Sequence, residues 1–194
     1  MIRKICLLNA HPDPSPERFC SALTDAYEEA ALETGCRVMR FNLGEMELPP
    51  LDRAEDFLTP PDPMLDPVRD AMRDADHVVM IFPLWLGGLP AKSRTVLEHL
   101  ARDGFFLDQN TEGAGWSAQK MRGKSARLIV TMGMPGAAYK LLFGAHSLKG
   151  LESGIFKISG FGPVRHSVFG LVESSPQRRE RMLKAVRKLG RLAS

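Results

Sequence analysis

The sequence predicts a doubly wound α/β fold, in which a five-stranded parallel sheet carries helices on both of its faces. Five short, mainly apolar runs alternate along the chain with segments of helical periodicity, and this alternation is typical of parallel sheets. The third run, residues 78–82, is apolar at every position, as expected of a strand buried on both faces. The sequence contains no repeat and no interdomain linker, so we expect residues 1–194 to form a single domain.

The elements follow in a regular order. The predicted strands span residues 2–8, 37–41, 78–82, 126–130 and 164–169. Helices are expected over residues 19–34, 66–75, 96–100 and 146–158 and from Pro176 onward, with a helical turn at 139–143. Residues 43–63 are rich in proline, which removes backbone donors, so they are expected to form an irregular surface excursion, either a lid or a dimer arm. Residues 103–124 are expected to form a long loop.

Composition excludes several classes of protein. A hydrophobic content of 44% and a charged content of 25% are ordinary for a soluble globular protein, and a net charge of +3 does not by itself indicate nucleic acid binding. No apolar run approaches the roughly 20 residues that span a bilayer, and no signal peptide is evident. The spacing of Cys6, Cys20 and Cys36 fits neither a disulfide framework nor a metal site. We therefore expect a cytoplasmic protein without a metal.

The first predicted strand leads into a polar, proline-containing loop and then into a helix that starts near Phe19. The free N–H groups and the dipole of a helix start favour an anion, typically a phosphate. Residues 11–21 are therefore predicted to bind phosphate. An ordinary strand–helix connection is the alternative, because a glycine-rich fingerprint is absent.

Two more strand ends carry unusual loops, at residues 83–91 and 131–139. In a parallel sheet, all three loops open at the same edge, where ligands of α/β proteins bind. The small residues Gly87 and Gly88 would let a flat ring approach the main chain closely. This combination favours a planar, phosphate-bearing cofactor, and a flavin mono- or dinucleotide is the obvious candidate.

Three motifs, in this order, resemble the flavodoxin-like NAD(P)H dehydrogenase (quinone) family. The first is Leu-Leu-Asn-Ala-His-Pro at residues 7–12, followed by Arg-Phe-Cys at 18–20. The second, and the most specific, is Phe-Pro-Leu-Trp at 82–85, followed by Leu-Pro-Ala at 89–91. The third is Val-Thr-Met-Gly at 130–133, followed by Tyr139. The resemblance extends from Ile2 to about Val172.

The resemblance implies a flavodoxin-like fold, bound FMN or FAD, and hydride transfer from NAD(P)H to a quinone or similar aromatic acceptor, commonly in a homodimer. The residues that would hold the phosphates and the ribityl chain are His11, Ser15, Arg18, Phe19 and Cys20. Those that would lie along the flavin ring are Pro83, Leu84, Trp85, Leu86 and Gly87. Thr131, Gly133, Gly136 and Tyr139 would close over the ring edge.

Tyr139 is expected to balance charge during hydride transfer, and His146 lies near a site histidine of some family members. The chain also departs from the family pattern, because Cys20 stands where an asparagine is common and one hydrogen bond to phosphate is then lost or replaced. Cys20 can also be interpreted as a small buried residue, and Trp85 as a core or dimer-interface residue.

Two other functions stay open. The first is a flavodoxin-type electron carrier without a substrate of its own. Such carriers tend to be acidic, and the net charge of +3 argues against this function. The second is a flavin-binding regulatory subunit of a membrane transport system. The basic face of the last helix permits the second function, although we interpret that face as a solvated surface. Its residues are Arg178, Arg179, Arg181, Lys184, Arg187, Lys188 and Arg191.

Overall fold

The computed structural model describes residues 2–107 and 118–194. Five strands form one parallel sheet in the order β2-β1-β3-β4-β5, so the predicted fold is confirmed. The strands are β1 (Lys4–Asn9), β2 (Arg37–Asn42), β3 (His77–Pro83), β4 (Ser125–Met132) and β5 (Val164–Gly170). The strand order reverses between β1 and β3, and ligands of doubly wound proteins bind beyond the carboxyl ends of the strands at such a point.

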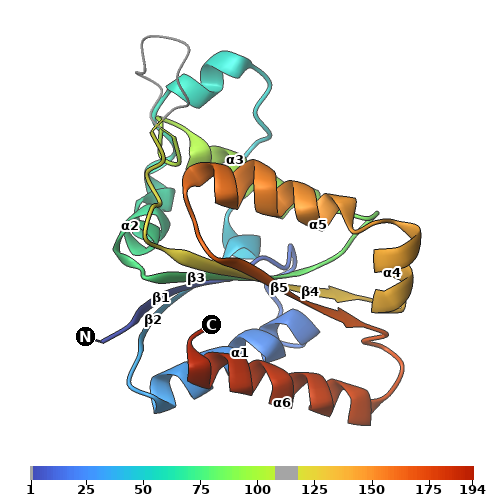
Figure 1. The fold of residues 1–194 in the computed structure, drawn as a ribbon. Coiled ribbons are helices and arrows are strands. Elements are labelled where there is room, and N and C mark those ends of the chain that lie inside the picture. The colour runs from blue at the N-terminus through green and yellow to red at the C-terminus, as the bar shows by residue number, and fades with distance from the viewer. Residues whose placement is uncertain (1, 108–117) are drawn as a thin grey trace.

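Helices cover both faces of the sheet (Figure 1). The helices α1 (Phe19–Glu33) and α6 (Pro176–Leu192) lie on one face, and α2 (Asp66–Asp74), α3 (Ala91–Ala101) and α5 (His146–Leu151) lie on the other. The short helix α4 (Gly136–Leu142) follows β4, and α5 continues as a π-helical segment over Glu152–Lys157. Within the described residues, no helix has both the length and the apolar character needed to cross a membrane.

The side chains of the strands alternate between two apolar layers. Cys6, Leu8, Val78, Met80 and Leu128 pack on the side of α2, α3 and α5. Their sequence neighbours on β1, β3 and β4, which include Ile5, Leu7, Val79, Ile81 and Ile129, pack toward α1 and α6. Every residue of β3 is buried, as its uninterrupted apolar run predicts. The rigid centre of the sheet therefore fixes where the loops at its carboxyl edge begin.

The excursion at residues 43–63 is attached to the end of α3. It contains short 3₁₀ turns at Leu43–Glu45, Ala54–Leu58 and Pro63–Leu65. His99 Nε2 lies 2.8 Å from the carbonyl oxygen of Pro49, and Arg102 Nε donates to the carbonyl oxygen of Asp56 at 2.8 Å. These contacts hold the excursion in place but do not test its predicted role as a lid or dimer arm. Of the predicted loop 103–124, residues 108–117 lie outside the described part, and Leu107 pairs with Gln119 across them.

Candidate functional site

A pocket of about 420 Å³ opens at the carboxyl edge of the sheet, where the three predicted loops meet. From the first loop it is lined by Glu17 and by the predicted residues His11, Arg18, Phe19 and Cys20. The second loop contributes Pro83, Leu84 and Trp85, and the third contributes Thr131, Met132 and Gly133. The structure thus brings together segments that are more than a hundred positions apart in the printed sequence.

Asn9, which the sequence analysis did not single out, organises the first loop. Its side chain is buried at the end of β1. The amide nitrogen donates to Ser21 Oγ and to Asn42 Oδ1, both at 3.3 Å, and the amide oxygen accepts from the backbone N–H of His11 at 3.3 Å. One side chain therefore connects the ends of β1 and β2 with the first turn of α1. The sequence contains a signal for this role, because Asn9 is a polar residue at the end of a mainly apolar strand.

The His11 imidazole stands between the loop backbone and Trp85. Its Nδ1 lies 2.8 Å from the carbonyl oxygen of Asp13 and 3.0 Å from the backbone nitrogen of Asp13, so the tautomer of the ring decides whether Nδ1 donates to the carbonyl or accepts from the N–H. Nε2 has no hydrogen-bond partner among the residues that the structure describes. Burial lowers the pKa of His11, and the Asp13 contacts only partly oppose this effect. Nε2 is therefore the ring nitrogen that is available to a ligand in the pocket, which His11 lines.

The start of α1 faces the pocket with unused backbone donors. No side chain caps this helix, whose N-cap residue is Arg18 in an extended conformation. In the described part of the chain, the N–H groups of Phe19 and Cys20 donate no hydrogen bond. Unpaired N–H groups at a helix start, together with the helix dipole, form a ready anion site.

Arg18 lines the pocket but is already paired. Its Nε and Nη2 donate to Asp13 Oδ2 at 2.7 Å and 2.5 Å. The pKa of Asp13 is lowered first by the backbone N–H of Ser15 and then by Arg18. Ser15 itself does not line the pocket, and its hydroxyl accepts from the backbone N–H of Glu17 at 3.3 Å. Ser15 therefore shapes the loop from behind.

Cys20 and Thr131 connect the first loop with the third. Cys20 Sγ lies 3.4 Å from Thr131 Oγ1, and both side chains are buried. Burial raises the pKa of the Cys20 thiol to about 11, which outweighs the opposing effect of the Thr131 contact. Cys20 is accordingly a protonated thiol at neutral pH, in agreement with its interpretation as a small buried residue.

The second loop ends in a tight turn. The backbone groups of Trp85 and Gly88 exchange two hydrogen bonds of 2.9 Å, with Leu86 and Gly87 at positive φ angles of 47° and 81°. Leu86 is fully exposed, and neither Leu86 nor Gly87 lines the pocket. The turn conformation accounts for the glycine at position 87. Trp85 is half-exposed, so it is not a core residue.

Three predicted site residues, two in the third loop and one at the start of α5, lie away from the pocket. A Cβ on Gly136 would stand 3.3 Å from Val168 Cγ1, so this glycine lets α4 pack closely on β5. Tyr139 is buried in the layer beneath α5, and its hydroxyl has no hydrogen-bond partner among the described residues. The His146 side chain is exposed and lies against Gly144. The structure therefore does not bring Gly136, Tyr139 or His146 to the pocket wall.

The remaining wall of the pocket consists of residues that were not predicted to belong to the site. Val172 and Glu173 follow β5, and Arg179 lies in the first turns of α6. The prediction of a solvated surface is wrong for Arg179, which is half-buried and lines the pocket. A helix that follows the last parallel strand must begin at the carboxyl edge, and this rule could have identified Arg179. Among the described residues its guanidinium has no partner.

Comparison with known protein families identifies the family of the chain. A family model described as a flavodoxin-like fold matches residues 3–192. The chain therefore belongs to the flavodoxin-like fold family, as the three sequence motifs predict. The strand order β2-β1-β3-β4-β5 agrees with this assignment.

Several proteins resemble the chain over most of its length. A protein of Haemophilus influenzae described as an uncharacterized NAD(P)H oxidoreductase is 27% identical over 172 residues, which cover 84% of this chain and 82% of that protein. The structure of an NAD(P)H:quinone oxidoreductase from Methanothermobacter marburgensis has a TM-score of 0.81 at 20% identity and covers 100% of both chains. An FMN-dependent NADH-azoreductase from Bacillus anthracis, solved in complex with FMN, has a TM-score of 0.72 at 16% identity and covers 99% of this chain and 100% of that one. At these identities, the two structures show the shared fold.

Proposed function

We propose that this chain is a flavin-dependent oxidoreductase that transfers hydride from NAD(P)H to a quinone, an azo compound or a similar aromatic acceptor. One observation carries the proposal: three distant loops line a single pocket at the carboxyl edge, beside the uncapped start of α1. The names of the relatives support the same chemistry, since they include an NAD(P)H oxidoreductase, a quinone oxidoreductase and an azoreductase.

The proposed cofactor is FMN. Its phosphate would meet the free N–H groups of Phe19 and Cys20, the unpaired Nε2 of His11 and the guanidinium of Arg179. Arg18 would contribute less, because Asp13 already neutralises it. The ring would lie along Leu84 and Trp85, and a Cβ at Gly133 would have open space around it, so the wall is recessed there. The azoreductase solved with FMN supports the choice of the mononucleotide over FAD.

The chemistry divides between cofactor and chain. When bound, a flavin accepts a hydride from a nicotinamide and passes two electrons to the acceptor. The chain would anchor the phosphate, and Leu84 with the half-exposed Trp85 would keep water from the ring. Tyr139 is proposed to assist charge balance, since its buried hydroxyl is a donor without a partner in the described residues. His146 is the weaker candidate because its side chain is exposed.

Our proposal includes a homodimer. Large apolar side chains are exposed on the loops and the helix at the carboxyl edge: Trp85, Leu86, Met134, Leu141 and Phe143. Exposed apolar side chains near a ligand site favour burial against another molecule. Sedimentation of the purified protein tests this point. A monomer at micromolar concentration would contradict it, and Leu141→Glu should dissociate the dimer if the surface is used.

The function itself is tested by purifying the protein, measuring its visible flavin absorbance and adding NADPH with menadione or an azo dye. Rapid two-electron turnover is the expected result. Bound flavin with negligible turnover would contradict the enzyme proposal and favour the regulatory subunit. Electron transfer to protein partners alone, without direct oxidation of NADPH, would favour the carrier. Mass measurement of the heat-released cofactor separates FMN from FAD.

A further inference from the structure

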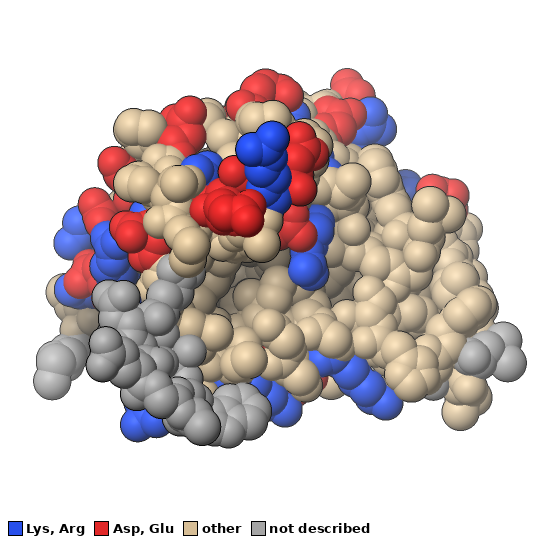
Figure 2. All heavy atoms as spheres, turned by 90° about the horizontal axis from the view of Figure 1, so that it is seen from above, with Lys and Arg blue, Asp and Glu red and all other residues tan. Residues whose placement is uncertain are grey.

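An apolar groove lies between α3 and α5, on the opposite side of the second loop from the cofactor pocket. It consists of two adjoining hollows of about 500 Å³ and about 370 Å³, which share Arg94, Gly154 and Ile155 in their walls. Seen from above, charged side chains gather on one part of this side of the molecule, and a broad area beside them carries almost only uncharged residues (Figure 2). The groove therefore offers a ligand a wall of mostly apolar residues.

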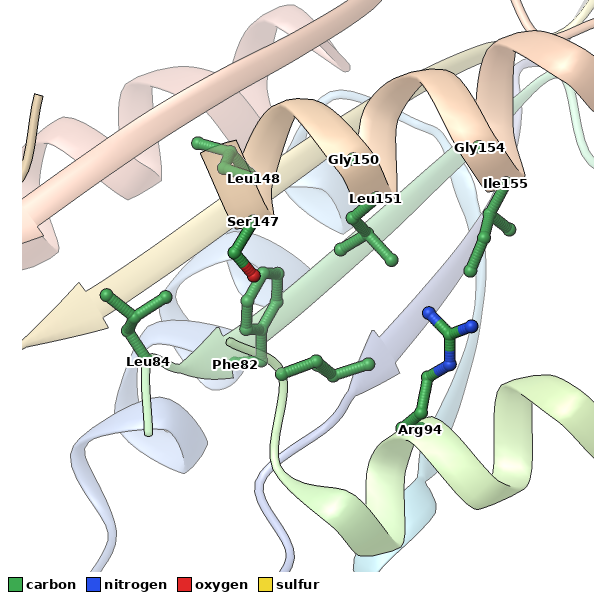
Figure 3. Close-up of a pocket in the computed structure, with 10 residues that line it drawn as sticks. Phe82, Leu84, Arg94, Ser147, Leu148, Gly150, Leu151, Gly154 and Ile155 are labelled. Carbon is green, nitrogen blue, oxygen red and sulfur yellow. The ribbon is translucent and has the colours of Figure 1, made fainter. Parts of the chain in front are cut away.

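One face of α5 and its π-helical continuation forms a wall of the groove. Ser147, Leu151 and Ile155 project from it toward α3 (Figure 3). Gly150 and Gly154 lie on the same face, and a Cβ at either position would meet no atom within 4 Å. The absence of side chains at these two positions leaves room for a flat ring between the leucine and isoleucine side chains and α3.

Arg94 is the one cationic side chain among the described residues that line the two hollows. It rises from α3 with its guanidinium facing Leu151 and Ile155 (Figure 3). Its Nε donates to Glu98 Oε1 at 2.8 Å, and both terminal nitrogens have no partner in the described part of the chain. A half-exposed guanidinium whose Nη1–Nη2 edge is free, beside an apolar wall, recognises a carboxylate or sulfonate well.

The groove adjoins the cofactor pocket. Leu84 lines both, and Phe82 at the end of β3 forms the floor of the groove next to it. A ring that enters the groove therefore approaches the position in which the proposed flavin ring would lie. Accordingly, the inference below rests on the proposed function where it concerns the acceptor, but the binding site itself is defined by α3 and α5.

We propose that the groove binds planar aromatic acids, with the ring against Leu151 and Ile155 and the acidic group on Arg94. The proposed enzyme would thus prefer electron acceptors that carry a sulfonate or carboxylate. A nicotinamide nucleotide would also bring anionic groups. A single arginine that already shares its charge with Glu98 suits one acidic group better than a multiply charged pyrophosphate.

A matched pair of fluorescent probes tests the binding site without any need for bound flavin. Anilinonaphthalene sulfonate carries the acidic group, and N-phenylnaphthylamine is the same ring system without it. Arg94→Met should weaken the sulfonate about tenfold and leave the neutral probe within about twofold, because only the charge-assisted contact is removed. Arg181→Met on α6 is the control and should change neither. Equal losses for both probes, or no loss for the sulfonate, would overturn the assignment.

Two further variants test the charge of Arg94 and the shape of the groove separately. Glu98→Gln frees Arg94 from its partner, so the sulfonate should bind a few-fold more tightly, by about the strength of a surface ion pair. Gly150→Leu fills open space in the groove, and both probes should be lost together. Unchanged binding in Gly150→Leu would place the probes elsewhere. The sulfonate affinity of the wild type should also fall with added salt, since Arg94 is partly exposed.

Kinetics then assign the acidic ligand to the acceptor. With bound flavin, Arg94→Met should lower kcat/KM for a sulfonated naphthoquinone and spare unsubstituted naphthoquinone and the KM for NADPH. A raised KM for NADPH with an unchanged acceptor preference would contradict the proposal. If a second copy of the chain covers the groove instead, probe binding will weaken as protein concentration rises, which also contradicts it. Failure of turnover with intact probe binding would remove only the proposed enzyme function.

Discussion

The two edges of the sheet both contain polar atoms without partners, but they differ in what can reach them. At the carboxyl edge, the unused N–H groups of Phe19 and Cys20 border an open pocket. Toward the amino edge, Tyr27 Oη, His77 Nε2 and Arg127 Nε are buried and unpaired among the described residues. The hollow at that edge is lined by other residues, including Arg3 and Asp76. The unpaired polar atoms toward the amino edge thus do not line the cavity nearest to them.

This comparison leads to different expectations for the two edges. Changes at the carboxyl edge should alter cofactor binding. Changes toward the amino edge should alter stability and its dependence on pH. Four predictions, taken from the largest expected effect to the smallest, can break or sharpen the distinction.

The largest effect is expected from Gly44→Ala. A Cβ at Gly44 would stand 2.6 Å from the carbonyl oxygen of His11 and 2.8 Å from that of Pro12. Backbone must move to admit it, so we expect a loss of about 3 kcal/mol in the free energy of unfolding, together with loss of flavin. Denaturant unfolding and flavin absorbance measure the two effects. Gly154→Ala, whose Cβ has open space, is the matched control. Full flavin content in Gly44→Ala would contradict the packing of the first loop described above.

The second prediction concerns acid stability. Burial, with smaller contributions from nearby arginines, lowers the pKa of His77 from 6.5 to about 3. Below pH 6.5 the unfolded chain takes up a proton that the folded chain does not, so stability is complete above that pH and falls as pH drops toward 3. Between pH 6.5 and pH 5 the loss from this residue is about 2 kcal/mol.

Replacement of the histidine checks that loss. His77→Gln should flatten the pH dependence over this range, as measured by urea unfolding at each pH. His11→Gln should flatten it less, since His11 is only partly buried. An identical slope in wild type and His77→Gln would show that His77 is not the buried titrating group.

The third prediction concerns the cofactor phosphate. Arg179 lines the pocket without a partner, whereas Arg18 is paired with Asp13. Arg179→Gln should therefore weaken FMN about tenfold, which is the usual effect of losing one charge-assisted hydrogen bond. Riboflavin, which lacks the phosphate, should bind as before, and Arg181→Gln should change neither affinity. Fluorescence quenching of the free flavins provides the measurement. An equal loss for FMN and riboflavin would place Arg179 near the ring instead.

The smallest effects on stability are expected from the two buried tyrosines. Removing a buried hydroxyl that has no partner is neutral or stabilises the protein by up to about 1 kcal/mol. Tyr27→Phe and Tyr139→Phe should therefore unfold at equal or slightly higher denaturant concentration. They should differ in function, because Tyr139→Phe is expected to slow hydride transfer and Tyr27→Phe is not. Equal turnover in both variants would remove Tyr139 from the catalytic residues.

The fold could be predicted because the spacing of apolar residues along the chain shows which faces of each strand and helix are buried. The run at 78–82 indicated the central strand, and the loops at 11–21, 83–91 and 131–139 were expected at one edge. Side-chain placement beyond the loops depends on tertiary contacts that no local pattern records. Tyr139 follows a glycine-containing loop, yet packing under α5 buries it. Gly87 was expected along the flavin ring, but its positive φ angle instead forms a tight turn, which the neighbouring residues alone did not predict.

The central claim is that the start of α1 and the side chains around it bind the phosphate of a flavin whose ring lies along the second loop. The most direct test compares the affinities of FMN and riboflavin for the flavin-free protein. Our account predicts that FMN binds at least about a hundredfold more tightly, since several backbone and charged donors would be unused with riboflavin. Equal affinities for the two flavins would contradict it.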